Sequence, residues 1–437
     1  MSGPRQATYS DSRPVCYSPP SSLNLRGGVP ESRYHHDECY YHEGRGAGEV
    51  YHRDEAIGLN GVGREKSNEH NVHDKGSPLR SSVDKTGTNT NIGIDMIPNI
   101  TLSNGIQMPQ LAFGTAPRAK PGELPSSCNN PGFAGFLPEQ VPRSLHLALQ
   151  TGMRHIDTAL IYRSHGHIAH VLQHWFMEGR LKREDVFITS KIYHPPARFG
   201  MDSTTIDIDN LSVEEVEKKV HEQFQQTLIE LGVGYIDLML LHWPSSGDGA
   251  GQAKDGNYDR NNAITMAEVD SIKRAKRTAA WKVLEHYYNI GWARAIGVSN
   301  FHEVHLQHLM EDGATIKPHV NQIESNVYTI QENIIQYCKD SDIAVMAFSP
   351  FGRGVMNMEN DDVLQSIGSK HTMSPGQIAL AYLLRRGFAV TFLSSSQERM
   401  RGNIDACRIA LDDDDMENLE SLQRSGSRGL QSPYSLS

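Results

Sequence analysis

Polar side chains stand where the apolar runs of this sequence end. The stretch "RHIDTALIY", residues 154–162, carries Asp157 and Tyr162 five positions apart in an otherwise apolar run. Two later runs, "VFITSK" and "IDLMLLH", end on Lys191 and His242. A strand that only filled a core would carry leucine or valine at such positions. These four residues are therefore candidates for chemistry rather than for packing.

Lys191 at the end of a buried strand needs a carboxylate partner, because an unpaired buried charge costs several kcal/mol. Asp157 is that partner if strand order follows sequence order. A nearby ammonium lowers the pKa of a phenol from about 10, since the cation stabilises the phenolate. Tyr162 could then donate a proton near neutral pH while His242 orients a carbonyl oxygen. Such a set would protonate an oxygen as it becomes an alkoxide, which is what hydride addition to a carbonyl requires.

Nearly every other apolar run also stops at a polar residue. A lone Asp after a strand is more often the N-cap of the next helix. A series that includes a lysine and a histidine is hard to explain by capping. The series is Thr115, Asp157, Lys191, His242, Ser299 with Asn300, Gln322, Ser349 and Ser394.

The elements that must position these side chains alternate between strand and helix patterns. Eight apolar runs of strand length begin near residues 111, 153, 186, 236, 293, 319, 343 and 389. Strands that are apolar throughout, with helices between them, predict a parallel sheet. Eight such units after Ile97 predict a (β/α)8 TIM barrel, whose chemistry lies at the carboxyl ends of the strands. An open doubly wound sheet is the alternative, but "FGTAPRAK" lacks the glycine-rich turn expected there.

Two local patterns are specific enough to predict single elements. The segment "SVEE" at Ser212 is a capping box with Glu215, and it predicts a helix that ends at Gly232. Asn104 and Gly105 form a two-residue turn signal between short apolar runs. We therefore expect an N-terminal β-hairpin ahead of the first barrel strand.

Composition limits the remaining possibilities. The chain has 437 residues and a formal net charge of -10, which argues against a nucleic-acid partner. Its five cysteines are widely spaced, and no run is long enough to span a membrane or act as a secretory signal, so a cytoplasmic location is expected. Residues 1–95 lack apolar periodicity and predict a flexible, disordered extension whose protein partner is unknown. Its histidine-rich segment 34–42 could bind a metal. Because the ligand spacing is irregular, we expect a disordered tail without a metal site instead.

The sequence resembles the aldo-keto reductases in several blocks that occur in the family's order. The blocks are "GMRHIDTALIY", "ITSK", "YIDLMLLHWP", "AIGVSNF", "NQIE", "FSPFGRG" and "SSSQERMRGN". The resemblance covers Ile97 to Leu422 and assigns residues 96–437 to the barrel, with an insertion at about 245–276. It implies NADPH as cofactor, with NADH possible, and a small-molecule carbonyl substrate.

The resemblance also implies roles for particular residues. Asp157, Tyr162, Lys191 and His242 would form the catalytic tetrad, with Tyr162 as the proton donor. Trp243 would line the substrate pocket with Tyr162 and His242. Ser299, Asn300 and Gln322 would hold the nicotinamide carboxamide, and Phe348 would stack on its ring. The cofactor contacts would be Thr115, Asp157, Ser299, Asn300, Gln322, Phe348, Ser349, Phe351, Ser394, Arg399 and Asn403.

The chain departs from the family pattern at several positions. Ser164 and His165 stand where an Asn-Glu pair is usual, and Ala116 replaces an aromatic residue of the substrate pocket. Leu393 replaces the lysine that usually meets the 2'-phosphate of NADP, and Gly402 replaces a glutamate. The predicted function is NAD(P)H-dependent reduction of aldehydes or ketones. The alternative is a cofactor-binding regulatory or scaffold protein with little turnover.

Overall fold

The computed structural model describes residues 97–117, 137–195, 202–245, 266–352 and 356–424. The predicted extension 1–95, with its histidine-rich segment, lies outside these residues. So do the C-terminal segment 425–437 and residues 246–265 of the predicted insertion. No helix in the described ranges is both long and apolar enough to cross a membrane.

Eight parallel strands close into a barrel in the order β10-β3-β4-β5-β6-β7-β8-β9. The strands are β3 (Leu111–Gly114), β4 (His155–Asp157), β5 (Phe187–Ile192), β6 (Ile236–Leu241), β7 (Ala293–Ser299), β8 (Val320–Glu324), β9 (Ala344–Phe348) and β10 (Ala389–Phe392). Each corresponds to one of the eight predicted runs. The barrel prediction is confirmed, and the open doubly wound alternative is wrong.

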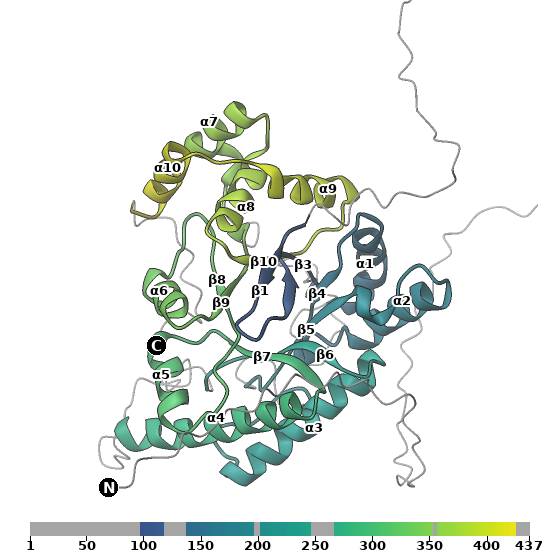
Figure 1. Ribbon diagram of the computed structural model, residues 1–437, viewed down its shortest axis with the longest axis vertical. Coiled ribbons are helices and arrows are strands. Elements are labelled where there is room, and N and C mark those ends of the chain that lie inside the picture. The colour runs from purple at the N-terminus through teal and green to yellow at the C-terminus, as the bar shows by residue number, and fades with distance from the viewer. Residues whose placement is uncertain (1–96, 118–136, 196–201, 246–265, 353–355, 425–437) are drawn as a thin grey trace, which may run out of the picture. The chain divides into compact units, whose positions relative to one another are not determined.

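Helices surround the barrel strands, as Figure 1 shows. They are α1 (Val141–Gln150), α2 (His165–Met177), α3 (Val213–Leu231), α4 (Met266–Asn289), α5 (Glu303–Glu311), α6 (Glu332–Asp340), α7 (Asp362–His371), α8 (Pro375–Arg385), α9 (Gln397–Asp405) and α10 (Asp413–Arg424). Neighbouring helices pack on one another, among them α1 on α2, α2 on α3 and α3 on α4.

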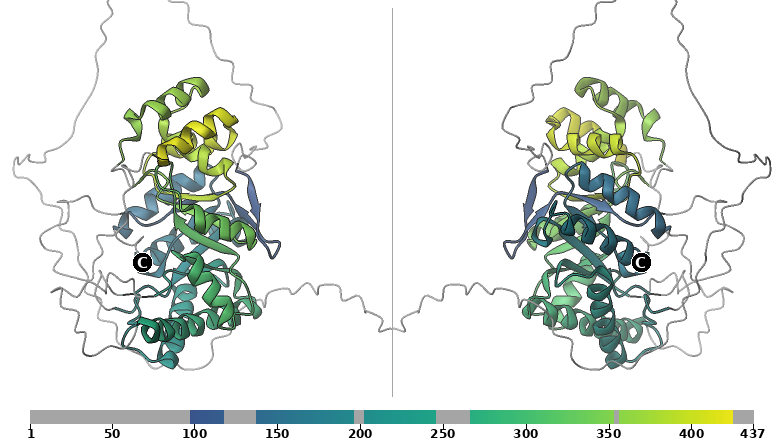
Figure 2. Two further views of the ribbon diagram at one scale, coloured as in Figure 1. Left: turned by 90° about the vertical axis from the view of Figure 1, so that its left-hand side faces the viewer. Right: turned by 90° about the vertical axis from the view of Figure 1, so that its right-hand side faces the viewer.

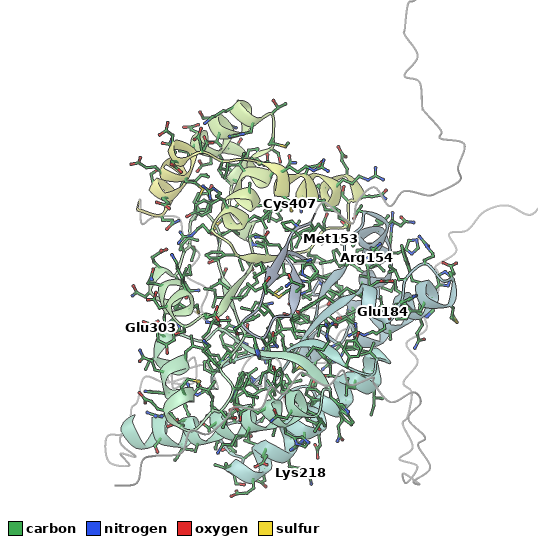
Figure 3. The ribbon with its side chains drawn as sticks, in the orientation of Figure 1. Met153, Arg154, Glu184, Lys218, Glu303 and Cys407 are labelled. Atoms are coloured by element: carbon green, nitrogen blue, oxygen red, sulfur yellow. The ribbon has the colours of Figure 1, made fainter. Side chains whose placement is uncertain are left out.

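Helix α3 has the ends that the sequence predicts. The Ser212 hydroxyl accepts from the Glu215 amide, and the Glu215 carboxylate accepts from the Ser212 amide, which completes the capping box. Gly232 ends the helix with φ of 63°, in the left-handed region that favours glycine. Val216 and Val220 are buried, whereas Lys218 is exposed and points away from the barrel in Figure 3.

A hairpin closes the amino-terminal end of the barrel. Strands β1 (Asn99–Thr101) and β2 (Gln107–Pro109) pair antiparallel, and the hairpin lies at one end of the barrel in Figure 2. Its Leu102 and Met108 join the cluster of inward-facing residues at the starts of the barrel strands. The hairpin prediction is confirmed, but the loop is longer than the two residues expected. The Leu102 amide bonds to the Ile106 carbonyl, and Gly105 has φ of 84°, which is typical of a three-residue loop with a bulge.

Side chains on the strands alternate between the barrel interior and the surrounding helices. On β5, Phe187 belongs to the interior cluster while Ile188 and Ile192 pack with the helices. Thr189 and Lys191 therefore point inward, and Ser190 points toward the helices. The same alternation turns Asp157 of β4 inward beside β5. Gly297 of β7 has no room for a side chain, because a Cβ there would lie 2.4 Å from the Val320 carbonyl oxygen.

Two ion pairs made by one buried carboxylate tie the amino-terminal ends of β5, β6 and β7 together. Asp237, near the start of β6, lies 2.7 Å from Arg183 and 2.8 Å from Arg294. Its Oδ2 also accepts a hydrogen bond from the Ile188 amide at 2.9 Å. These bonds stabilise the barrel at the end opposite its carboxyl rim.

Helix α4 begins before the predicted end of the insertion. The sequence places the insertion up to Lys276, and the last residues of that segment, from Met266, belong to this helix. Lys276 is buried, and its ammonium donates to the carbonyls of Ile208 and Asp209 at 2.6 and 3.2 Å. Because a lysine occupies a buried position here, the apolar residues of this helix do not form a regular pattern in the sequence.

Candidate active site

A buried ion pair forms the centre of the candidate site. The Lys191 ammonium donates to Asp157 Oδ1 at 2.8 Å and to the Thr158 carbonyl at 3.0 Å. The second Asp157 oxygen, Oδ2, accepts from Gln322 Nε2 at 2.7 Å. Both carboxylate oxygens are thus paired, which compensates for burial of the charge. The Asp157–Lys191 pair predicted from neighbouring strands is present.

Lys191 faces the Tyr162 phenol as well as Asp157. Its Nζ lies 5.1 Å from the centre of the Tyr162 ring. Burial works against a charge on Lys191, but the Asp157 carboxylate and the Tyr162 oxygen outweigh it, so the pKa of Lys191 is raised. The ammonium therefore keeps its positive charge at neutral pH beside Tyr162.

The His242 ring meets the Tyr162 ring edge-on, with 5.9 Å between the ring centres. Two hydrogen bonds hold the backbone of His242 in place. Its amide donates to the Ile192 carbonyl at 2.8 Å, and its carbonyl accepts from Asn300 Nδ2 at 2.9 Å. Four side chains from three neighbouring strands and the loop after β4 are thus brought together at one rim of the barrel.

The residues expected to hold a carboxamide lie beside this group. Ser299 Oγ donates to the Gln322 carbonyl at 2.9 Å, and Asn300 Nδ2 lies 3.1 Å from Ser299 Oγ. Asn300 has φ of 63°, a left-handed conformation that asparagine tolerates better than most residues. The structure places Gln322 against Asp157 as well, a contact that the sequence did not predict.

Three hydroxyl groups connect Tyr162's loop to Asp157. Thr115 Oγ1 donates to the Asp157 carbonyl at 3.0 Å and lies 3.2 Å from Ser164 Oγ. Ser164 Oγ lies 3.0 Å from Thr158 Oγ1. All three are buried. Ser164 is one of the departures from the pattern expected in the sequence. Its buried hydroxyl makes hydrogen bonds that hold the start of α2 in place.

The other predicted cofactor positions lie at the ends of β9 and β10. Phe348 and Ser349 are half-buried, and Phe351 lies 6.5 Å from Phe392 between ring centres. Ser394 Oγ accepts from the Ser396 amide at 3.2 Å, and Ser396 caps α9 through the Arg399 amide. Arg399 is exposed in the first turn of α9, and Asn403 is buried one turn later. Leu393 stands 42% exposed beside them.

His194, which follows β5 by two residues, is not among the residues predicted from the sequence. Its ring centre lies 4.8 Å from that of His242 and 6.3 Å from that of Trp243. Its Nδ1 lies 2.6 Å from the Pro195 carbonyl, an acceptor, so Nδ1 carries the proton. His194, Tyr162 and Trp243 are half-buried, whereas Asp157 and Lys191 are buried. The ring cluster therefore forms the more open side of the site.

A closed parallel barrel with polar side chains gathered at its carboxyl rim is the architecture of TIM-barrel enzymes. The model of the Aldo/keto reductase family matches residues 129–424. The chain belongs to this family.

Individual relatives agree with that assignment. Aldose reductase C of Dictyostelium discoideum is 32% identical over 327 residues, which cover 74% of this chain and 89% of that protein. Human aldo-keto reductase family 1 member C4 is 30% identical over 312 residues, 67% of this chain and 87% of that protein. A Bombyx mori aldo-keto reductase solved in complex with NADP is 27% identical, with a TM-score of 0.57 over 75% of this chain and 93% of that one.

Proposed function

We propose that this protein reduces aldehydes or ketones to alcohols with NADPH, with Tyr162 as the proton donor. The observation that carries the proposal is the buried Lys191 ammonium, 2.8 Å from Asp157 Oδ1 and facing the Tyr162 ring. A fixed positive charge beside a phenol favours loss of the phenol proton to a substrate oxygen. Membership of the aldo/keto reductase family supports the same chemistry.

The rim residues fit a nicotinamide cofactor. Gln322 offers an amide group beside Asp157, and Asn300 offers one beside the His242 carbonyl. Half-buried Phe348 offers an aromatic face for a flat ring. Exposed Arg399, at the capped amino-terminal turn of α9, offers a cation to a phosphate. The Bombyx mori relative was solved with NADP and another aldo-keto reductase with NADPH. When bound, the reduced cofactor supplies the hydride for the carbonyl carbon.

The protein side of the reaction follows from the four rim residues. Tyr162 and His242 hydrogen-bond the substrate's carbonyl oxygen and orient the carbonyl carbon. As the carbon gains a hydride, the C=O π electrons move to the oxygen, and the Tyr162 hydroxyl gives that oxygen its proton. Lys191 stabilises the resulting phenolate, and Asp157 keeps Lys191 charged and in place. Solvent then returns a proton to Tyr162.

The half-buried rings determine which carbonyls can approach. Trp243 and His194 stand next to His242. Ala116 and Tyr162 both pack against the buried pair Ala159 and Ile161. An alanine at that place leaves more room than an aromatic residue would, so bulky substrates are expected to be accepted.

The test is oxidation of NADPH, followed by its fluorescence, with a panel of aliphatic and aromatic aldehydes and ketones. Turnover of any member, with formation of the matching alcohol, supports the proposal. Tight binding of NADPH without turnover on the whole panel would contradict it and favour the alternative, a cofactor-binding regulatory protein.

A further inference from the structure

The first residues of α2 hold a second buried polar group, on the helix side of β5. His165 Nδ1 lies 3.1 Å from Glu230 Oε2, and His165 Nε2 lies 3.1 Å from Ser190 Oγ. His165 and Ser190 are buried, and Glu230 is half-buried near the end of α3. These three residues, called the His165 clamp below, join α2, β5 and α3.

The partners define the direction of each bond. A carboxylate only accepts, so His165 Nδ1 donates to Glu230. In the neutral ring Nε2 then accepts, and the Ser190 hydroxyl donates to it. The interaction with the imidazole lowers the pKa of Glu230 despite its burial, which raises it, so the carboxylate stays ionised near neutral pH.

This order of bonds is that of a hydrolase triad, but the location excludes hydrolysis. Ser190 shares its face of β5 with Ile188 and Ile192, which pack with the helices. The serine hydroxyl is covered on that side by α2 and α3, which pack on each other. A substrate carbonyl cannot reach it, so the group holds structure rather than attacking an ester.

The clamp lies directly behind two residues of the site. Ser190 precedes Lys191 on β5, and His165 follows Tyr162 by three positions. The intervening chain is short and constrained, because Arg163 has φ of 56° and forms an ion pair with Asp202. A shift of the His165 ring would therefore move Tyr162 relative to Lys191.

We infer that His165 is a positioning residue that sets the place of Tyr162 against Lys191 through Ser190 and Glu230. Its kinetic consequence rests on the proposed function. Misplacing a proton donor by about 1 Å can cost about a hundredfold in rate without affecting cofactor binding. His165 and Ser164 stand where the family usually has Glu and Asn, so this chain uses its own pair of residues here.

The test compares Ser190→Ala and His165→Leu with a matched control, Thr227→Val. Thr227 is also buried on α3, but its hydroxyl bonds to the Gln223 carbonyl of the same helix. Ser190→Ala removes one hydroxyl and leaves no large cavity, so it is the variant that keeps its fold. We expect both clamp variants to lose about ten- to a hundredfold in kcat, with an unchanged Kd for NADPH. The control should keep its kcat.

A second measurement does not depend on turnover. The amides of Tyr162 and Arg163 donate to the carbonyls of Ala159 and Leu160 at 3.0 and 3.1 Å. Hydrogen exchange at these amides should accelerate in the clamp variants and stay unchanged in Thr227→Val. Unchanged exchange in Ser190→Ala, or a kcat equal to that of the control, would overturn the inference. Absence of turnover in the unmodified protein would instead contradict the proposed function, and the exchange data would still decide the clamp.

Discussion

Lys191 Nζ and Asp157 Oδ1 lie 2.8 Å apart inside the barrel, and the Tyr162 ring covers the same ammonium. One lysine thus serves two acidic groups of different strength. The Asp157 carboxylate keeps the lysine protonated, and the positive charge of the lysine faces the Tyr162 phenol. The proposed reduction needs this arrangement, whereas a buried ion pair by itself contributes little net stability.

Removing the ammonium should destabilise the fold. Among the described residues, Lys191→Met leaves the buried Asp157 carboxylate with Gln322 as its remaining side-chain partner, which costs about 3–5 kcal/mol of unfolding free energy. Denaturant unfolding checks this value. The double variant Lys191→Met with Asp157→Asn should recover most of the stability but none of the reductase activity. Equal stability of the single and double variants would show that the pair is not coupled.

Removing the proton donor should leave binding intact. Tyr162→Phe keeps the ring but lacks the hydroxyl, and we expect carbonyl reduction to fall by about 10²–10⁴-fold. The Kd for NADPH, measured by fluorescence quenching, should change little. A variant that kept near-normal turnover would show that another group gives the proton.

Cofactor preference should depend on Leu393 and Arg399. Exposed Arg399 in the first turn of α9, without a lysine at position 393, predicts a modest preference for NADPH over NADH. Leu393→Lys adds a charge-assisted contact worth about 1.5–3 kcal/mol, so the preference should rise roughly ten- to a hundredfold. Arg399→Ala should erase it. The ratio of the two dissociation constants at fixed salt is the measurement, and an unchanged ratio in both variants would place the 2'-phosphate elsewhere.

Stability should fall in mild acid because of His155. Burial lowers the pKa of this histidine from 6.5 to about 4, and its ring bonds to the Pro109 carbonyl and the Thr189 hydroxyl. Between these values the unfolded chain binds the extra proton and the folded chain does not, so stability decreases as pH falls below about 6.5. The loss from pH 7.5 to 5 should be about 2 kcal/mol for this group. His155→Gln cannot titrate, and its unfolding free energy should lack this part of the pH dependence.

The fold was predictable because eight mostly apolar runs of strand length alternate with helical patterns, and polar residues stand at or just after the ends of these runs. Asp157 was the expected partner of Lys191 because strand order was expected to follow sequence order, and β4 does pair with β5. The contact between Gln322 and Asp157 was not predictable, because β4 and β8 face each other only when the barrel is closed. The place of His194 in the site was not predictable either. His194 follows Tyr193, whose φ of 64° turns the chain back toward His242, and no local pattern signals such a turn at a tyrosine.

The start of α4 could not be predicted from hydrophobic periodicity. Its first turns are polar, and Lys276 reaches backbone carbonyls of another loop, so tertiary contacts rather than periodicity define the element.

Strand β6 carries Asp237 near one end and leads into His242 at the other. Asp237 forms ion pairs with Arg183 and Arg294, whereas His242 lies at the open rim of the barrel. Selection can therefore act on the two ends separately. Substitutions at Asp237 would lower the amount of protein that survives in a cell, whereas those at His242 would leave abundance unchanged and alter only the chemistry. New substrate ranges can evolve at the rim while the inherited framework below it stays the same.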